Sequence, residues 1–327
     1  MKKYLVTGAA GFIASQVCKQ LLDADNEVLG VDNLNDYYDI RLKEWRLAQL
    51  REHKKNHNFR FKKLDVENHS ELEELFRAES QFDAVLNLAA RAGVRYSMEN
   101  PHVYLSTNTE GTLNLIDCMK ENDCPKFVLA STSSLYAGQP MPFKESLPVN
   151  MPLSPYAASK KAAELMAYSY HKLYGLDVSV VRYFTVFGEA GRPDMSIFRF
   201  IKWIDEGVPI QLFGDGGQSR DFTYIDDIAR GTLAAAKEIG FEIFNLGGGK
   251  TPITLNEIIA KIECLIGKKA IIEYKAFHIA DIMETCADID KAKRLLGWFP
   301  QTTLDEGLER SVRWYMDNRD WVKEINC

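Results

Sequence analysis

The chain has 327 residues, enough for roughly two domains of ordinary size. Hydrophobic residues make up 46% of it and charged residues 26%, a globular balance that excludes disordered and fibrous proteins. The 40 Lys and Arg and the 46 Asp and Glu give a net charge of −6, which argues against a nucleic-acid or anionic-membrane surface.

Cysteine and histidine usage bounds the chemistry further. The six cysteines and six histidines are scattered without metal-ligand spacing, so we expect reduced thiols and no metal site. No apolar run is long enough to span a bilayer. The N-terminus enters a strand at once and leaves no room for a signal peptide, so we expect a cytoplasmic protein.

Short apolar runs alternate with amphipathic stretches along the first half of the chain. Strands that alternate with helices indicate βαβ units in a parallel sheet covered on both faces. The predicted strands are Tyr4–Thr7, Glu27–Asp32, Phe59–Asp65, Phe82–Ala89, Lys126–Ser131 and Asp177–Phe184, and the predicted helices cover 12–24, 70–79, 101–121 and 155–174.

The pattern changes after Phe184. Loops, short strands and helices follow: a helix near 195–206, a strand at Ile210–Phe213, and helices from Thr254, near 288–296 and near 304–320. A helix at 226–239 and a strand at Phe241–Leu246 are expected to rejoin the sheet. The sequence predicts an α/β fold, a doubly wound parallel sheet of the Rossmann type with a second, smaller mixed α/β domain. Residues 1–186 plus about 221–250 form the first domain, and about 187–220 and 251–327 form the second.

A glycine-rich turn joins the first strand to the first helix, Thr7-Gly8-Ala9-Ala10-Gly11-Phe12-Ile13-Ala14. Gly8 permits a tight turn, and Gly11 lets a pyrophosphate approach the backbone N–H groups that open the helix. Ala14 holds the third glycine position, which accepts alanine. An ordinary strand–helix turn is the alternative.

Two carboxylates at strand ends favour a dinucleotide-binding turn over an ordinary strand–helix turn. Asp32 ends the second strand, where a carboxylate accepts hydrogen bonds from both ribose hydroxyls of adenosine. Its charge would repel a 2′-phosphate, which favours NAD over NADP. Asp65 ends the third strand and is placed to contact the adenine amino group. Together with the glycine turn, they predict dinucleotide binding.

A phenol and an ammonium lie one turn apart on one helix face in Tyr156-Ala157-Ala158-Ser159-Lys160. The Lys160 charge and a nicotinamide cation are expected to lower the pKa of Tyr156 toward working pH, which would make it a general base. Tyr168 and Lys172 repeat this spacing, but they lie about 18 Å further along the helix at 1.5 Å per residue. We expect Tyr168 to be a packing residue.

Hydroxyl side chains follow the fifth predicted strand in Ser131-Thr132-Ser133-Ser134. A hydroxyl at a strand end can hydrogen-bond the reacting oxygen of a sugar or alcohol. A serine-rich turn that satisfies its own backbone is the alternative.

These motifs together resemble the extended short-chain dehydrogenase/reductases that act on nucleotide sugars, over almost the whole chain. Within that family, residues 32–39, 182–188 and 192–195 resemble UDP-glucuronate 4-epimerases. Departures are Ala137, where the family has glycine, and His278 and Ala280, which fall where it has a polar residue and a glycine.

The resemblance implies epimerisation at C4 of UDP-glucuronate to UDP-galacturonate through a 4-keto sugar, with hydride transferred to bound NAD and back. Tyr156 would be the base, Thr132 would share a proton with the C4 oxygen, and Lys160 would also hold the nicotinamide ribose. The first domain would bind NAD and the second the UDP-sugar. The implied cofactor-binding residues are Gly8, Gly11, Phe12, Ile13, Asp32, Asn33, Asn35, Asp65, Val66, Leu88, Ala89, Ala90, Asn108, Ser131, Tyr156, Lys160 and Tyr183. The implied substrate-binding residues are Arg95, Thr132, Ser133, Ser134, Thr185, Arg192, Arg220 and Asp281.

Two positions separate related sugar chemistries. Ser134 stands where dehydratases and decarboxylases of the family carry a glutamate, and a hydroxyl has no acid–base reach near pH 7. Thr185 stands where glucose/galactose epimerases usually have asparagine. Arg192, Arg220 and Arg95 are candidates for the diphosphate or uridine, against the alternative of solvated surface arginines.

Alternatives remain open at this point. A UDP-glucose/UDP-galactose 4-epimerase or another UDP-sugar epimerase is one, and a non-catalytic NAD-binding sensor is another. Helices 101–121 and 155–174 are expected to form an intersubunit four-helix bundle, which predicts a homodimer.

Overall fold

The protein is described by a computed structural model over residues 1–79, 81–250, 252–276 and 282–327. Seven parallel strands form one sheet in the order β11-β6-β5-β4-β1-β2-β3. Their bounds are β1 (Lys3–Thr7), β2 (Glu27–Asp32), β3 (Phe59–Lys63), β4 (Ala84–Asn87), β5 (Lys126–Thr132), β6 (Asp177–Tyr183) and β11 (Phe241–Leu246). The predicted α/β fold with a parallel sheet is confirmed.

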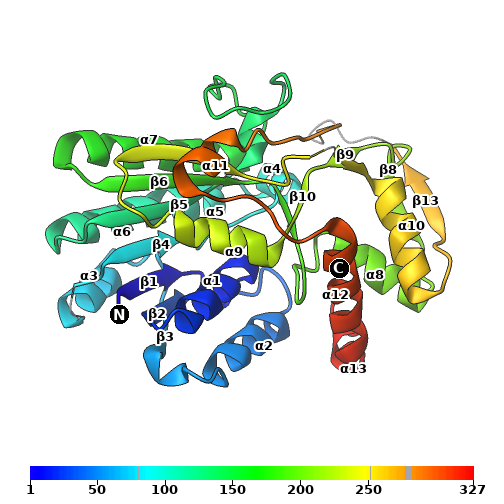
Figure 1. Ribbon diagram of the computed structural model, residues 1–327, viewed down its shortest axis with the longest axis horizontal. Helices are drawn as coiled ribbons and strands as arrows, with labels where there is room; N and C mark the ends of the chain where they lie inside the picture. Colours follow the sequence, from blue (N-terminus) through cyan, green and yellow to red (C-terminus); the bar gives the residue numbers. More distant parts are fainter. Residues whose placement is uncertain (80, 251, 277–281) are drawn as a thin grey trace.

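Helices cover both faces of this sheet (Figure 1). Successive strand residues point to opposite faces, so Val85 packs in one apolar cluster and Leu86 in the other. The cluster of Leu86 contains residues of α1 (Phe12–Asp23), α2 (Ile40–Arg51), α9 (Ile225–Ala234) and α11 (Asp290–Leu296). The cluster of Val85 contains residues of α3 (His69–Ala78), α6 (Gly111–Glu121) and α7 (Pro155–Tyr174).

A second region with its own apolar core lies beside the sheet, at the right of Figure 1. Its helices are α8 (Ser196–Glu206), α10 (Leu255–Ile266), α12 (Leu304–Asp317) and α13 (Arg319–Val322). Its short strands pair as β8 (Ile210–Phe213) with β13 (Ile272–Lys275), β7 (Thr185–Phe187) with β10 (Phe222–Tyr224), and β9 (Ser219–Arg220) with β12 (Ile253–Thr254). Helix α11 and Trp298 pack with the sheet instead, so the two regions interleave.

Some elements differ from the sequence-based expectations. Helix α2, capped by the Asp39 side chain, is not among the predicted helices. The predicted helix 226–239 ends at Ala234. The predicted helix 101–121 is divided into α5 (His102–Tyr104), the π-helical segment η2 (Leu105–Glu110) and α6. The remaining short elements are α4 (Val94–Glu99), η1 (Asn56–Asn58) and η3 (Ser133–Tyr136).

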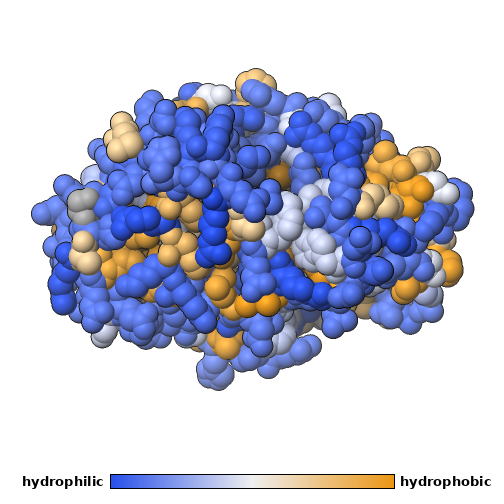
Figure 2. Space-filling view, turned by 90° about the horizontal axis from the view of Figure 1, so that it is seen from below, coloured by the Kyte–Doolittle hydropathy of each residue, from blue (hydrophilic) through white to orange (hydrophobic). Residues whose placement is uncertain are grey.

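The surface view of Figure 2 is mostly hydrophilic, with hydrophobic side chains in separate patches. Within the described residues, no helix is long and apolar enough to cross a membrane, and no group of three or more His, Cys, Asp or Glu is placed to hold a metal ion. The six cysteines are free, and Cys18, Cys118 and Cys124 are buried.

Candidate active site

A cavity of about 380 Å³ lies where the carboxyl ends of the central strands meet. Loops that follow β1, β2 and β4, the ends of β5 and β6, the start of α7 and the segment from β7 to residue 195 line it. The predicted site residues that it brings together are Gly8, Gly11, Phe12, Ile13, Asp32, Asn33, Asn35, Asp65, Val66, Leu88, Ala89, Ala90, Ser131, Thr132, Ser133, Ser134, Tyr156, Lys160, Tyr183, Thr185 and Arg192.

The glycine turn forms one wall. Gly8 has a positive φ of 68°, and a Cβ there would meet backbone atoms of Ala89 at 2.9 Å. A Cβ on Gly11 would meet the Gly8 carbonyl oxygen at 2.8 Å. No side chain caps α1, so the N–H groups of its first turn are left for an anion. The turn therefore has the shape and polarity of a pyrophosphate cradle.

Asp32 lies at the end of β2, buried beside this cradle. Its carboxylate accepts hydrogen bonds from the backbone N–H groups of Ala10 (3.2 Å) and Leu34 (2.8 Å). The Lys43 ammonium, on α2, lies 3.7 Å from the same carboxylate. Asp65, at the same edge of the sheet, accepts from the Asn33 amide at 2.7 Å. These contacts fix both carboxylates at the rim of the cavity.

Tyr156 and Lys160 enter the cavity from the first turns of α7. Ser154 caps the helix by accepting from the Ala157 N–H (3.2 Å), and Pro155 occupies its first turn. The Lys160 ammonium donates to the Ala130 carbonyl at 2.9 Å, and burial lowers the pKa of this lysine to about 8. Lys160 thus places a buried, desolvated ammonium group in the wall of the cavity.

The pKa of Tyr156 depends on its burial and on two neighbouring groups. Burial raises the pKa of the phenol, while its hydrogen bond with Thr132 and the Arg192 charge act in the opposite direction. Because desolvation outweighs both favourable contacts, a further positive charge is needed to make Tyr156 a base near neutral pH.

The second Tyr–Lys pair lies outside the cavity. The Tyr168 ring packs edge-on against Phe241, with ring centres 5.0 Å apart, and the Lys172 ammonium lies 5.5 Å from the centre of the Tyr168 ring. Tyr168 remains 43% exposed. The prediction that it is a packing residue fits these contacts.

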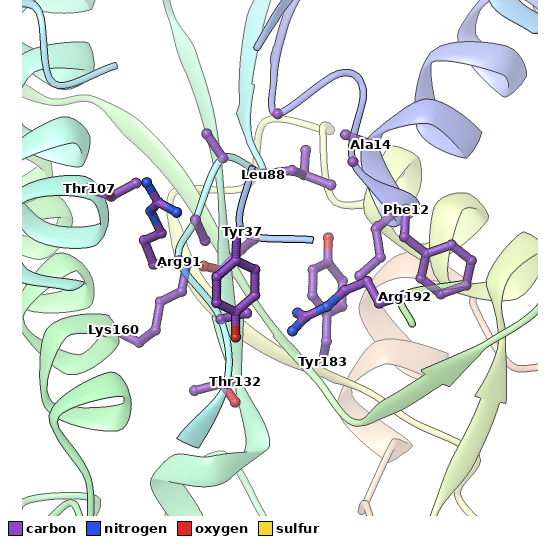
Figure 3. Close-up of a pocket in the computed structure, with 18 of the residues that line it drawn as sticks. Phe12, Ala14, Tyr37, Leu88, Arg91, Thr107, Thr132, Lys160, Tyr183 and Arg192 are labelled. Carbon is purple, nitrogen blue, oxygen red and sulfur yellow. Dashed lines mark hydrogen bonds between the residues drawn. The ribbon is translucent and has the colours of Figure 1, made fainter. Parts of the chain in front are cut away.

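Three further hydroxyl side chains and Arg192 also line the cavity. Ser133 and Ser134 come from η3, and Thr185 begins β7. Arg192 makes a bidentate ion pair with Asp194, with Nε–Oδ1 and Nη2–Oδ2 distances of 3.0 and 2.5 Å. Figure 3 places Tyr37 and Arg192 toward one another in the middle of the cavity, with Thr132 below them and Lys160 to one side.

Four predicted residues do not line this cavity as described. Asn108 donates to the Arg91 carbonyl and the Ser159 hydroxyl, both at 2.9 Å, so it supports the wall from behind. The Arg95 guanidinium lies over the Phe213 ring at 4.0 Å. Arg220 donates to the Ser219 carbonyl at 2.8 Å. Asp281, together with His278 and Ala280, lies outside the described residues.

Two predicted cofactor contacts have side chains engaged with the protein. The Ser131 hydroxyl donates to the Glu164 carboxylate at 2.7 Å. The Tyr183 hydroxyl shares a hydrogen bond with Thr232 at 2.8 Å. Both residues line the cavity, but their polar atoms already have partners.

Sequence reasoning missed several cavity residues, above all Tyr37, Lys43 and Arg91. Signals existed for two of them: Tyr37 lies within residues 32–39, a segment that carries the family resemblance, and Arg91 directly follows the predicted cofactor contact Ala90. Nothing local marks Lys43, on α2, as a cavity residue.

Comparisons with known proteins agree on one group of relatives. A model of the NAD dependent epimerase/dehydratase family matches residues 4–247. The chain is 60% identical over 325 residues, 99% of both chains, to the UDP-glucuronate 4-epimerase of Thermodesulfobacterium geofontis. Its structure is similar to that of UDP-glucuronic acid 4-epimerase from Bacillus cereus in complex with UDP-glucuronic acid and NAD, with a TM-score of 0.89, 37% identity and coverage of 97% and 99% of the two chains. It is also similar to UDP-glucose 4-epimerase from Thermotoga maritima with UDP-glucose, with a TM-score of 0.87, 30% identity and coverage of 97% and 99%.

Proposed function

The chain belongs to the NAD dependent epimerase/dehydratase family, and from this premise we propose that it interconverts UDP-glucuronate and UDP-galacturonate by inverting C4. The observation that carries the proposal is the 60% identity, over 99% of both chains, to a UDP-glucuronate 4-epimerase. The cavity supports it, because a dinucleotide cradle and a Tyr–Lys pair open into one space.

The residues of the cradle fit NAD. The space over Gly8 and Gly11 admits a pyrophosphate against the uncapped start of α1. Asp32 faces the cavity with a carboxylate that can accept from both ribose hydroxyls. When bound, NAD supplies the hydride acceptor and donor for C4 and a positive charge near the base.

We assign the proton at the C4 oxygen to Tyr156. The phenolate takes the hydroxyl proton as the sugar becomes a 4-keto intermediate, and the phenol returns it after the sugar has turned over. Thr132, hydrogen-bonded to Tyr156, holds the C4 oxygen beside it. Lys160 adds a buried positive charge at the floor and a donor for the nicotinamide ribose.

The hydroxyls of Ser133, Ser134 and Thr185 hold the substrate carboxylate in this proposal. A 4-keto glucuronate is a β-keto acid, and it loses CO₂ when its C5–C6 bond stands perpendicular to the carbonyl plane. Donors that fix both carboxylate oxygens keep this bond near the plane. A serine at position 134 adds no acid–base group that would promote elimination.

The rest of the nucleotide sugar extends toward the second region. Arg192 steadies the diphosphate side, and its Asp194 partner holds the guanidinium in place. We assign Arg220, which lies on β9 of the second region, and Arg95, whose guanidinium contacts Phe213 of β8, to the diphosphate or the uridine, and Asp281 to the uridine. The division into an NAD-binding domain, residues 1–186 plus about 221–250, and a UDP-sugar domain is part of this proposal.

The assembly and its place in the cell are also proposed. Leu165, Leu173 and Tyr174 are exposed apolar side chains on α7, and Leu105 is another on η2. They support a homodimer formed through these helices, and a monomeric mass by light scattering at micromolar concentration would exclude it. We place the reaction in the cytoplasm, where the six free thiols stay reduced.

One experiment tests the function. The purified protein is incubated with UDP-glucuronate without added NAD, and in parallel with UDP-glucose and with UDP-N-acetylglucosamine. We expect UDP-galacturonate in the first reaction and turnover at least tenfold slower in the others. Faster turnover of a neutral sugar would make the protein a different UDP-sugar epimerase, and NAD binding without turnover would make it a sensor.

A further inference from the structure

Helix α7 contacts the end of β5 at two successive turns. The Lys160 ammonium donates to the Ala130 carbonyl at 2.9 Å. One turn later, the Glu164 carboxylate accepts from the Ser131 hydroxyl at 2.7 Å. The next residue along the strand is Thr132, which is hydrogen-bonded to Tyr156. The position of the catalytic hydroxyls therefore depends on where these two contacts hold the strand end.

Glu164 is almost fully buried and is held by a guanidinium. Arg182, on β6, donates from Nε to one carboxylate oxygen at 2.9 Å and from Nη2 to the other at 2.7 Å. Both side chains are at most 2% exposed. A buried bidentate pair of this kind is geometrically strict, and removal of one partner leaves an unpaired charge.

The same guanidinium continues the network across the sheet. Its Nη1 donates to the Tyr136 hydroxyl at 2.7 Å, and that hydroxyl donates to Asn245 on β11 at 2.8 Å. Tyr136 ends η3, the segment that carries Ser133 and Ser134. Buried hydrogen bonds of this pair thus join α7, the end of β5, the last residue of η3 and β11.

The charge of Glu164 also acts on Lys160. It is the one charged group that raises the pKa of this lysine, which burial lowers to about 8. The charged side chains that line the cavity with Lys160 or lie near it are the cations Lys43, Arg91, Lys161, Arg182 and Arg192 and the carboxylates Asp32, Asp65 and Glu164. Of the carboxylates, Glu164 is the one whose charge acts on the pKa of Lys160 and favours the ammonium form.

We propose that Glu164 is a positioning residue for the reaction: anchored by Arg182, it fixes the end of β5 through Ser131 and keeps a negative charge one helical turn from the Lys160 ammonium. Its effect on the rate rests on the proposed function, whereas its effect on Lys160 does not.

The titration of Lys160 tests this directly. Lysines are labelled with carbon-13 at Cε in the protein with its co-purified NAD, and the Lys160 signal is assigned by its loss in Lys160→Met. We expect a midpoint near pH 8 in the unaltered protein. Glu164→Gln should lower it by roughly one unit, and Glu164→Asp, which keeps the charge, should leave it near pH 8.

The chain offers a matched control on the same two strands. Lys126 on β5 and Asp177 on β6 form a partly buried ion pair, 2.5 Å apart, at the opposite ends of these strands. Asp177→Asn should lower the melting temperature as Glu164→Gln does, without moving the Lys160 midpoint. A purely structural role for Glu164 would make the two variants alike.

The kinetic arm uses the same variants. Glu164→Gln should reduce kcat about tenfold with little change in KM, and the basic limb of its pH profile should move with the Lys160 midpoint. If the stranded Arg182 charge prevents folding, Glu164→Gln combined with Arg182→Gln provides an amide pair for the same titration, with a smaller fall of the midpoint expected because a cation is removed together with the anion. An unchanged midpoint in a folded variant overturns the proposal. Absence of turnover in every protein, the unaltered one included, contradicts the proposed function while the titration still decides the role of Glu164.

Discussion

Helix α7 carries two tyrosine–lysine pairs of identical spacing that differ in almost everything else. Tyr156 and Lys160 lie in its first two turns, in a cavity at the carboxyl edge of the sheet, and Lys160 is 3% exposed. Tyr168 and Lys172 lie three turns further, with Tyr168 half in solvent and packed on Phe241. Spacing places two side chains on one helix face, but the end of the sheet that they face decides their chemistry.

Burial explains why the pair Tyr156 and Lys160 is suited to catalysis and the pair Tyr168 and Lys172 is not. Lys160 is buried away from water, and this burial lowers its pKa to about 8 although the charge of Glu164 acts in the opposite direction. The Lys172 ammonium instead lies over the ring of Tyr168 at the surface. Groups whose pKa values are shifted by a dry environment are typical of catalytic sites.

Removal of the two phenol hydroxyls should separate the pairs most strongly. Tyr156→Phe should retain the fold and NAD but lower kcat at least ~100-fold, since general-base catalysis is lost. Tyr168→Phe, the matched control, should change kcat little because its hydroxyl lies outside the cavity. Steady-state rates with UDP-glucuronate measure both. Equal impairment of the two variants would mean that position on the helix does not distinguish them.

The second prediction concerns what the first pair has beside it and the second lacks, a cofactor cradle. Asp32→Ala should weaken NAD binding by about 1.5–3 kcal/mol, roughly 10- to 150-fold, because an ionised acceptor for the ribose hydroxyls is lost. Preference for NAD over NADP should also relax, since Lys43 stays behind where the carboxylate was.

Titration calorimetry on protein stripped of cofactor measures both affinities. Asp83→Ala is the control. Asp83 directly precedes β4, at the amino end of the strand and away from the cavity, and its carboxylate accepts a hydrogen bond from the Lys3 N–H. Retention of NAD through purification of Asp32→Ala, equal to that of the control, would contradict the assignment.

The third prediction is a pH profile that belongs to the first pair alone. Lys160 is charged below its pKa of about 8 and neutral above it, so kcat/KM should fall above pH 8, about tenfold for each further unit. Lys172→Met should leave this limb in place. Rates measured from pH 6 to 10 test it, and a profile that stays flat through the alkaline range would show that the charge of Lys160 is not needed.

The smallest expected effect concerns the hydroxyls that face the base. Thr185→Ala or Ser133→Ala removes one donor to the substrate carboxylate, worth about 1.5–3 kcal/mol of orientation. A fraction of turnovers should then end in loss of CO₂, with release of a 4-keto pentose nucleotide and accumulation of NADH.

Mass spectrometry and the absorbance of reduced nicotinamide detect these products. Ser169→Ala, on the exposed part of α7, serves as the control, since its hydroxyl donates to the Leu165 carbonyl and faces no substrate. Variants that slow epimerisation without CO₂ or NADH would show that these hydroxyls do not guard the intermediate.

Sequence reasoning reached the parts of the site that strand ends and local spacing define. The positions of Gly8, Gly11 and Asp32 could be predicted because they lie within one βαβ unit, whose turn is determined by the local sequence. Lys43 could not be predicted, since α2 reaches the cavity only through the packing of the whole sheet. The rise in the pKa of Tyr156 could not be predicted either, because it is caused by burial, and residue spacing does not report burial.

The roles of polar residues in and behind the cavity wall were hardest to infer. Asn108 reads as a cofactor contact in sequence, yet its side chain holds the Arg91 backbone and Ser159. Ser131 reads as another, yet it donates to Glu164. Both are polar groups that the fold had to satisfy, and a sequence does not reveal which polar groups become buried.

The fate of the hydrogen on C4 distinguishes hydride transfer within the site from exchange with solvent. UDP-glucuronate deuterated at C4 is incubated with the protein in ordinary water without added NAD. If hydride leaves and returns within one closed site, UDP-galacturonate should form with the deuterium still at C4. Product that carries solvent hydrogen at C4, or turnover that depends on added NAD, would contradict the account.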